Sequence, residues 1–295
     1  MEINKPTLSD NYTIINSISK YCFALLAGFV LTSLLSPVTL KAQGNLLITP
    51  KRVVFEGSRR SMDLNLANIG NDTATYAISM VQIRMNEDGS FETITEPDPG
   101  QRFADRFIRF FPRSVTLGPN ESQLVKLQLI RQGEMTPGEY RSHMYFRALP
   151  EKKPLGEEDI IKDTSSISVK LVPVFGITIP AIVRVGESNT SITITDVALD
   201  YAGDSPRLSL IFNRTGNMSV YGDLKVDHIS PQGVSTRVGV ANGIAIYTPN
   251  SRRKLQFSLN KVQEVDFTSG KLHITFSAPS DIKPATYAEA ELIIP

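Results

Sequence analysis

The chain has one cysteine, no tryptophan and three histidines among its 295 residues, and these scarcities exclude several kinds of chemistry. Cys22 lies inside an apolar run near the N-terminus, so neither a disulfide framework nor thiolate chemistry is expected in the rest of the chain. His143, His228 and His273 stand far apart, without a second ligand at strand or helical spacing. The sequence therefore predicts no metal site.

An excess of either charge sign is also missing. The chain carries 31 basic and 30 acidic residues, and no basic face is visible that could follow a nucleic-acid backbone. Glycine-rich phosphate loops, a serine nucleophile elbow and a cysteine–histidine pair are not found either. We therefore expect no nucleic acid, no cofactor and no small-molecule substrate as a partner. The chain is also predicted not to be an enzyme.

The first 42 residues have the order of a secretory signal peptide. Lys20 precedes the apolar run "YCFALLAGFVLTSLL", which is followed by Pro37 and by the small residue Ala42. We expect cleavage near Ala42, and hence a mature chain that begins near Gln43 and carries almost no net charge. The alternative is an uncleaved membrane anchor over residues 21–40, which could nearly span a bilayer.

Beyond residue 43 the hydrophobic pattern has a period of two almost everywhere. Short runs such as "TYAISMVQIRM", "SQLVKLQLI" and "KLHITFSA" are separated by turn sequences such as "NEDGS" and "LGPNES". Many short strands without an amphipathic helix predict an all-β chain of two antiparallel sandwiches. The predicted boundary is "VRVGES", residues 183–188, which gives domains over 43–184 and 185–295 joined by a bend rather than a flexible linker.

Three segments carry a resemblance to a known family. "ITPKRVVFEGSRRSMDLNLANIGNDTATYAISMVQI", "FIRFFPRSVTLGPNESQLVKLQL" and "GEYRSHMYFRALP" resemble, in this order, the N-terminal domain of the periplasmic chaperones of pilus and fimbrial assembly. The match covers most of residues 46–183. The second domain resembles the family's smaller sandwich more loosely, chiefly through "NRTGNMSVYGDLKV".

The resemblance implies a fold and a function. The fold is two immunoglobulin-like β-sandwich domains set at an angle, behind a signal peptide. The function is that of a periplasmic chaperone, which binds pilus or fimbrial subunits by donor-strand complementation and anchors the subunit's C-terminus. The resemblance leaves open which subunit is the client, and whether an outer-membrane usher is a further partner.

The resemblance also points to residues that would anchor the subunit. Arg52 falls on the family's cleft arginine, and a guanidinium can hold a carboxylate through two parallel hydrogen bonds. The family's second cation has no direct counterpart here, so Lys170, the one cation of the segment 165–180, is taken as the second anchor. The alternative for Arg52 and its neighbour Lys51 is that one or both of these cations merely contact solvent at a strand end.

The donor strand is sought in "SSISVKLVPVFGITIP", residues 165–180. Its apolar residues of one parity share a face, and the predicted donor residues are Ile167, Val169, Leu171, Phe175 and Ile177. The alternative is that this face fills the protein's own core.

A second function remains open from the residues alone. The chain could be a secreted structural or adhesive protein made of two sandwiches, without a client. A chaperone forms one-to-one complexes with subunits, whereas a structural protein polymerises or stays at the cell surface.

Overall fold

The computed structural model describes residues 45–150, 174–201, 205–263 and 265–294. Strands and two 3₁₀ turns, Asp105–Phe107 and Gln132–Glu134, are the regular elements of these residues. Across the same ranges, no helix has the length and hydropathy needed to cross a membrane. The predicted signal peptide, residues 1–42, lies outside the described part of the chain.

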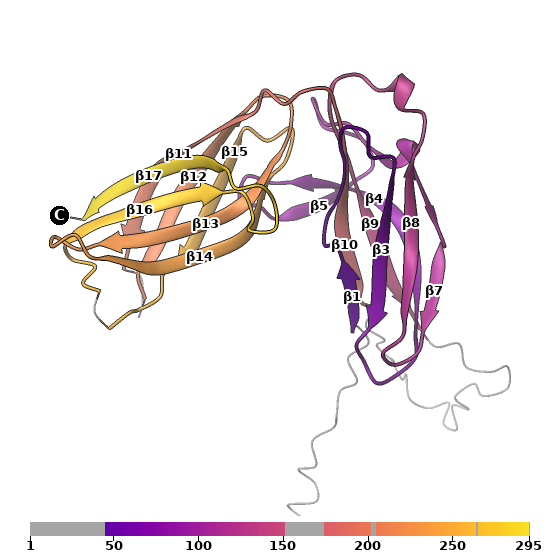
Figure 1. The fold of residues 1–295 in the computed structure, drawn as a ribbon, viewed down its shortest axis with the longest axis horizontal. Helices are drawn as coiled ribbons and strands as arrows, with labels where there is room; N and C mark the ends of the chain where they lie inside the picture. The colour runs from indigo at the N-terminus through magenta and orange to yellow at the C-terminus, as the bar shows by residue number, and fades with distance from the viewer. Residues whose placement is uncertain (1–44, 151–173, 202–204, 264, 295) are drawn as a thin grey trace, which may run out of the picture. The chain divides into compact units, whose positions relative to one another are not determined.

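The first sandwich consists of two sheets (Figure 1). One sheet has the order β1-β3-β8-β6, and its strands are β1 (Leu46–Thr49), β3 (Ser61–Asn68), β8 (Ser122–Leu129) and β6 (Ile108–Phe111). The other has the order β2-β10-β9-β4-β5, with β7 also paired to β4; its strands are β2 (Val53–Phe55), β10 (Gly176–Val185), β9 (Gly138–Leu149), β4 (Ala74–Met85), β5 (Phe91–Ile94) and β7 (Ser114–Leu117).

The chain changes sheet between β1 and β2. β1 pairs antiparallel with β3, whereas β2 pairs in parallel with β10, in the register Ala181↔Val53, Ile182↔Val54 and Val183↔Phe55. Residues 50–52 make the crossing, and Pro50 suits this place because it has no N–H to give to either sheet. The crossing therefore puts Arg52 at the edge of the second sheet, one residue before β2 starts.

The second sandwich follows β10 in the chain and also has two sheets. One has the order β11-β12-β15, with β11 (Ser191–Asp200), β12 (Arg207–Thr215) and β15 (Arg252–Ser258). The other has the order β14-β13-β16-β17, with β14 (Ser235–Ile246), β13 (Val220–Ile229), β16 (Gly270–Ser277) and β17 (Thr286–Ile294).

Each sandwich encloses its own apolar core, because alternate residues of its strands point inward. Phe55, Phe107 and Phe146 are almost fully buried in the first core. Phe212 and Phe276 pack against each other in the second, with ring centroids 4.8 Å apart. The predicted fold class, two β-sandwiches in an all-β chain, is confirmed, whereas the predicted angle between them remains a prediction.

The turns have the chemistry that the sequence predicts for them. Gly89 of "NEDGS" has a φ of +82°, and Asn120 of "LGPNES" has a φ of +59°. Glycine and asparagine are the residues that adopt this left-handed region most readily. These two turns reverse the chain between β4 and β5 and between β7 and β8.

Candidate binding site

The outer face of the β2-β10-β9 sheet carries an unusual set of charged residues. In β9, Glu139, Arg141 and His143 alternate with residues that point into the first core, and the burial pattern shows all of these positions to be buried. Cα partners are Arg184 for Glu139, Ile182 for Arg141 and Pro180 for His143. Because residues two apart in a strand share a face, the outer face of β9 is charged and yet covered.

Residues of the second sandwich cover this face. Ile182 forms a small apolar cluster with Met85, Ala245 and Tyr247, and Val54 and Tyr221 pack against it. Tyr221 belongs to β13 and Ala245 to β14, while Tyr247 follows β14 directly. The charged side chains of β9 therefore lie next to an apolar, aromatic surface rather than in water.

Arg52 lies on this face beside two aromatic rings. Its guanidinium carbon is 4.6 Å from the ring centroid of Tyr221 and 5.7 Å from that of Tyr247. Such cation–π contacts stabilise a guanidinium that has lost water. Nη1 of Arg52 is buried and has no hydrogen-bond partner among the described residues. Burial lowers the pKa of Arg52, and the nearby Arg184 lowers it further.

Arg141 is more deeply buried, with 3% of its surface exposed. Its guanidinium carbon lies 4.1 Å from the ring centroid of Tyr247, and Nη2 donates a hydrogen bond of 3.2 Å to the Thr248 carbonyl. Nε and Nη1 are buried and have no partner within the part of the chain that is described. Burial lowers the pKa of Arg141, and the charge of Arg52 adds to this effect. We call Arg52, Arg141, Tyr221 and Tyr247 the arginine cluster.

Glu139 is the one buried acid that the described residues place on this face, and both of its oxygens already accept hydrogen bonds. Oε2 of Glu139 accepts hydrogen bonds from N–H and Oγ–H of Ser219, at 3.0 and 2.6 Å, and from Nε of Arg184 at 3.2 Å. Oε1 accepts from Oγ1 of Thr248 at 3.4 Å. Among the described residues, no acid forms an ion pair with Arg52 or Arg141. The cluster therefore carries two guanidinium groups without a hydrogen-bonded counter-ion from the described residues.

His143 lies beside the cluster as a neutral ring. Burial, followed by the charges of Arg141 and Arg52, lowers its pKa from 6.5 to about 3. Its ring centroid is 6.2 Å from that of Tyr247 and 6.1 Å from that of Phe91. The imidazole does not add a third positive charge near neutral pH.

Of the two predicted anchors, Arg52 is found in the cluster, and Lys170 lies outside the described residues. Ile167, Val169 and Leu171 of the predicted donor strand lie outside them as well. Phe175 is described and is 46% exposed just before β10, whereas Ile177 is half-buried and packs against the first core. Part of the predicted donor face therefore contributes to the protein's own sandwich, as the alternative interpretation expected.

Sequence reasoning missed Arg141. The signal was present in "GEYRSHMYFRAL", where Glu139, Arg141 and His143 share one parity of a strand whose other parity is core-facing. What the sequence does not show is that Tyr247 packs over this face of the strand. Without Tyr247 above it, a charged face of a strand is an ordinary solvent-exposed face.

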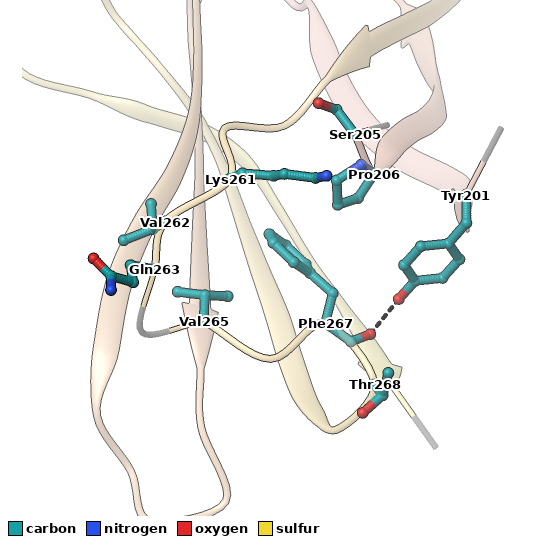
Figure 2. Close-up of a pocket in the computed structure, with 9 residues that line it drawn as sticks. All are labelled: Tyr201, Ser205, Pro206, Lys261, Val262, Gln263, Val265, Phe267 and Thr268. Carbon is teal, nitrogen blue, oxygen red and sulfur yellow. Dashed lines mark hydrogen bonds between the residues drawn. The ribbon is translucent and has the colours of Figure 1, made fainter. Parts of the chain in front are cut away.

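A hollow lies within the C-terminal sandwich (Figure 2). Val262, Val265 and Phe267 give it an apolar lining, Lys261 contributes a cation, and the Tyr201 hydroxyl donates to the Phe267 carbonyl. None of the described atoms lining it is a buried polar group without a partner. Nor do the described residues hold a cluster of three or more histidine, cysteine or acidic side chains that could bind a metal. The arginine cluster is thus the stronger candidate.

Comparison with known proteins gives likenesses in structure but not in sequence family. No protein-family model matches the chain, and no curated protein matches it. Among solved structures, the chain resembles the YadV chaperone, with 13% identity, a TM-score of 0.41 and coverage of 85% of this chain and 100% of that one. It also resembles the CupB2 chaperone of Pseudomonas aeruginosa, with 10% identity, a TM-score of 0.39 and coverage of 84% and 100%.

A third solved structure is the chaperone DraB of E. coli, with 14% identity, a TM-score of 0.39 and coverage of 85% of this chain and 96% of that one. At such identities and TM-scores, the function has to be argued from the site itself.

Proposed function

We propose that the protein is a periplasmic chaperone that binds and stabilises pilus or fimbrial subunits, without enzymatic activity. It would hold a subunit in two ways. An extended segment that includes the start of β10 would supply a strand to the subunit, and the arginine cluster would bind the subunit's terminal carboxylate.

The observation that carries the proposal is the buried Nη1 of Arg52, which has no hydrogen-bond partner among the described residues. A buried cation without a counter-ion is costly, and proteins keep such a group where a ligand supplies the missing charge. A carboxylate matches the planar donors of a guanidinium, and the rings of Tyr221 and Tyr247 keep water away from the pair. Arg52 is therefore suited to an anionic chain end.

The edge of β10 supports the donor-strand part of the proposal. β2 pairs only with Ala181, Ile182 and Val183 of β10, so residues 176–180 have β9 as their one partner among the described strands. Val174 and Phe175, directly before this edge, are exposed by 48% and 46%. Exposed apolar side chains beside an unpaired strand edge are features that strand addition uses.

The test is to co-purify the exported, tagged protein with a pilus subunit from the periplasm and to measure the stoichiometry. We expect a soluble one-to-one complex, and a subunit that aggregates when it is expressed alone. Calorimetry then compares a synthetic peptide of that subunit's C-terminal strand, as free acid and as amide, and we expect tighter binding of the acid. Polymerisation of the protein by itself, without a subunit, would instead identify a structural component and contradict the proposal.

A further inference from the structure

We propose that Arg141 is the second cation of the carboxylate site, so that Arg52 and Arg141 together bind one carboxylate beside Tyr247. Lys170, the second anchor that the sequence predicts, lies outside the described residues. The identity of the ligand as a subunit's chain end rests on the proposed function, whereas the anion site itself rests on the geometry of the cluster.

The strand register brings the two arginines to one place on the sheet. Arg141 of β9 and Val54 of β2 are both Cα partners of Ile182 on β10, and Arg52 precedes Val54 by two residues, on the same face. β2 and β9 lie on opposite sides of β10, so they are about 10 Å apart, and two arginine side chains can bridge such a distance. Both guanidinium groups contact the ring of Tyr247, at 4.1 Å for Arg141 and 5.7 Å for Arg52.

The electrostatics of the cluster favour an anion there. The two guanidinium groups repel each other, and each lies in surroundings that penalise its charge. The charge of the nearby buried acid, Glu139, raises the pKa of both arginines and so partly opposes this penalty. Its oxygens, however, accept hydrogen bonds from Ser219 and Arg184 and from neither arginine of the cluster. A bound carboxylate would accept hydrogen bonds from both arginines and would remove most of their mutual repulsion.

Arg141 retains donors for such a ligand. Its one side-chain hydrogen bond with described residues, to the Thr248 carbonyl, uses Nη2, while Nε and Nη1 remain buried without a partner. Arg52 is half-buried, and Arg141 is the deeper of the two. A carboxylate would therefore meet Arg52 first and reach Arg141 behind it.

The first test measures the anion site without any subunit. The probe is N-acetylated tetra-alanine with a free C-terminal carboxylate, added at millimolar concentration to the protein with labelled arginine side chains. We expect saturable shifts of the Arg52 and Arg141 guanidinium resonances with the acid and none with the amide. Shifts confined to Arg52, or equal shifts with the amide, would overturn the role of Arg141.

The second test uses variants of Arg141 and the subunit peptide described above. We expect Arg141→Gln to reduce the preference for the acid over the amide by about 30-fold, and Arg141→Lys to restore part of it. Arg147→Gln is the matched control, because Arg147 belongs to the same strand and parity but is exposed. Loss of stability without loss of the acid preference would show that Arg141 is only structural.

The two proposals fail in different ways. If the tetra-alanine acid shifts both arginines but no subunit complex forms, the carboxylate site stands and the chaperone function does not. If the subunit binds and Arg141→Gln keeps the full preference for the acid, the chaperone function stands and the inference about Arg141 is wrong.

Discussion

Glu139 and Ser219, eighty residues apart in the chain, are joined by two hydrogen bonds to a single oxygen atom. Oε2 of Glu139 accepts from the backbone N–H of Ser219 at 3.0 Å and from its hydroxyl at 2.6 Å. Arg184 contacts both residues, because Nε donates to Glu139 at 3.2 Å and Nη2 donates to the Ser219 carbonyl at 2.7 Å. Glu139 belongs to the first sandwich and Ser219 immediately precedes β13 of the second. The ion pair between Glu139 and Arg184 of the first sandwich is therefore joined by hydrogen bonds to Ser219 of the second.

The first prediction concerns this link. Glu139→Ala should destabilise the protein by about 3 kcal/mol, because it leaves Arg184 and the Ser219 N–H without their buried acceptor. Urea denaturation followed by circular dichroism measures the change. Glu187→Ala is the control, since Glu187 is exposed, and it should change stability by less than about 0.5 kcal/mol. Equal effects of the two variants would contradict the structural role of Glu139.

The second prediction concerns Arg52. Arg52→Ala should leave the fold intact, because it removes a cation that burial and the neighbouring charge of Arg184 already penalise. It should weaken binding of the free-acid subunit peptide by about 2 to 5 kcal/mol, because the carboxylate loses its charged partner. Arg52→Lys should recover only part of the affinity, since an ammonium lacks the planar pair of donors.

Lys51→Ala provides the control for Arg52, because Lys51 is the exposed neighbour. Calorimetry with the acid and amide peptides gives the comparison. If Lys51→Ala weakens binding as much as Arg52→Ala does, the effect is one of general charge, and Arg52 holds no carboxylate.

The third prediction concerns the start of β10. Phe175→Asp should keep the melting temperature nearly unchanged, because Phe175 is 46% exposed, but it should abolish complex formation if this side chain enters an apolar groove of the client. Thr178→Asp changes an exposed residue of the opposite parity and should be tolerated better. Thermal unfolding measured beside co-purification tests both variants. Loss of stability in Phe175→Asp would show that this residue serves the protein's own core.

The fourth prediction concerns the pH dependence of stability. The pKa of His143 falls from 6.5 to about 3 in the folded protein, so between these values the unfolded chain takes up a proton that the folded chain does not. Stability should therefore decrease as the pH falls below 6.5, by up to about 1.4 kcal/mol per pH unit from this group. The contribution is absent above pH 6.5.

His143→Gln should remove this slope. The comparison is best made between about pH 6.5 and 4.5, because carboxyl groups with lowered pKa values, such as Asp98 and Asp266, add their own loss of stability at lower pH. Urea midpoints at several pH values give the two curves. Parallel curves for the wild-type protein and the variant would show that His143 titrates normally.

The outline of the fold could be predicted because it depends on local pattern. In β12, Leu208, Leu210 and Phe212 alternate with more exposed residues, and that period of two is sufficient to identify a strand with one face in a core. The turns at Gly89 and Asn120 were equally readable, since few residues accept a positive φ. Both signals are contained within a few consecutive residues.

The pairing of distant segments could not be read in this way. Nothing in "TPKRVVFEG" indicates that β2 pairs in parallel with β10, more than 120 residues later. This pairing aligns Arg52 with the charged face of β9. Nor does "GEYRSHMYFRAL" reveal that Tyr247 covers Arg141. These relationships depend on which sheet edges meet, and an edge can accept many partners of similar local pattern.

The sequence by itself thus determined the strands, the turns, the two-sandwich architecture and the candidacy of Arg52. The tertiary structure alone decided that Arg52 and Arg141 both contact the ring of Tyr247. It also decided that Glu139 accepts hydrogen bonds from Ser219 and Arg184, and that Ile177 packs against the core of the first sandwich. The physical reason is that periodicity specifies which face of a strand is apolar. What covers the other face, and hence whether a charge there meets water, a ring or a counter-ion, is fixed only when distant parts of the chain pack together.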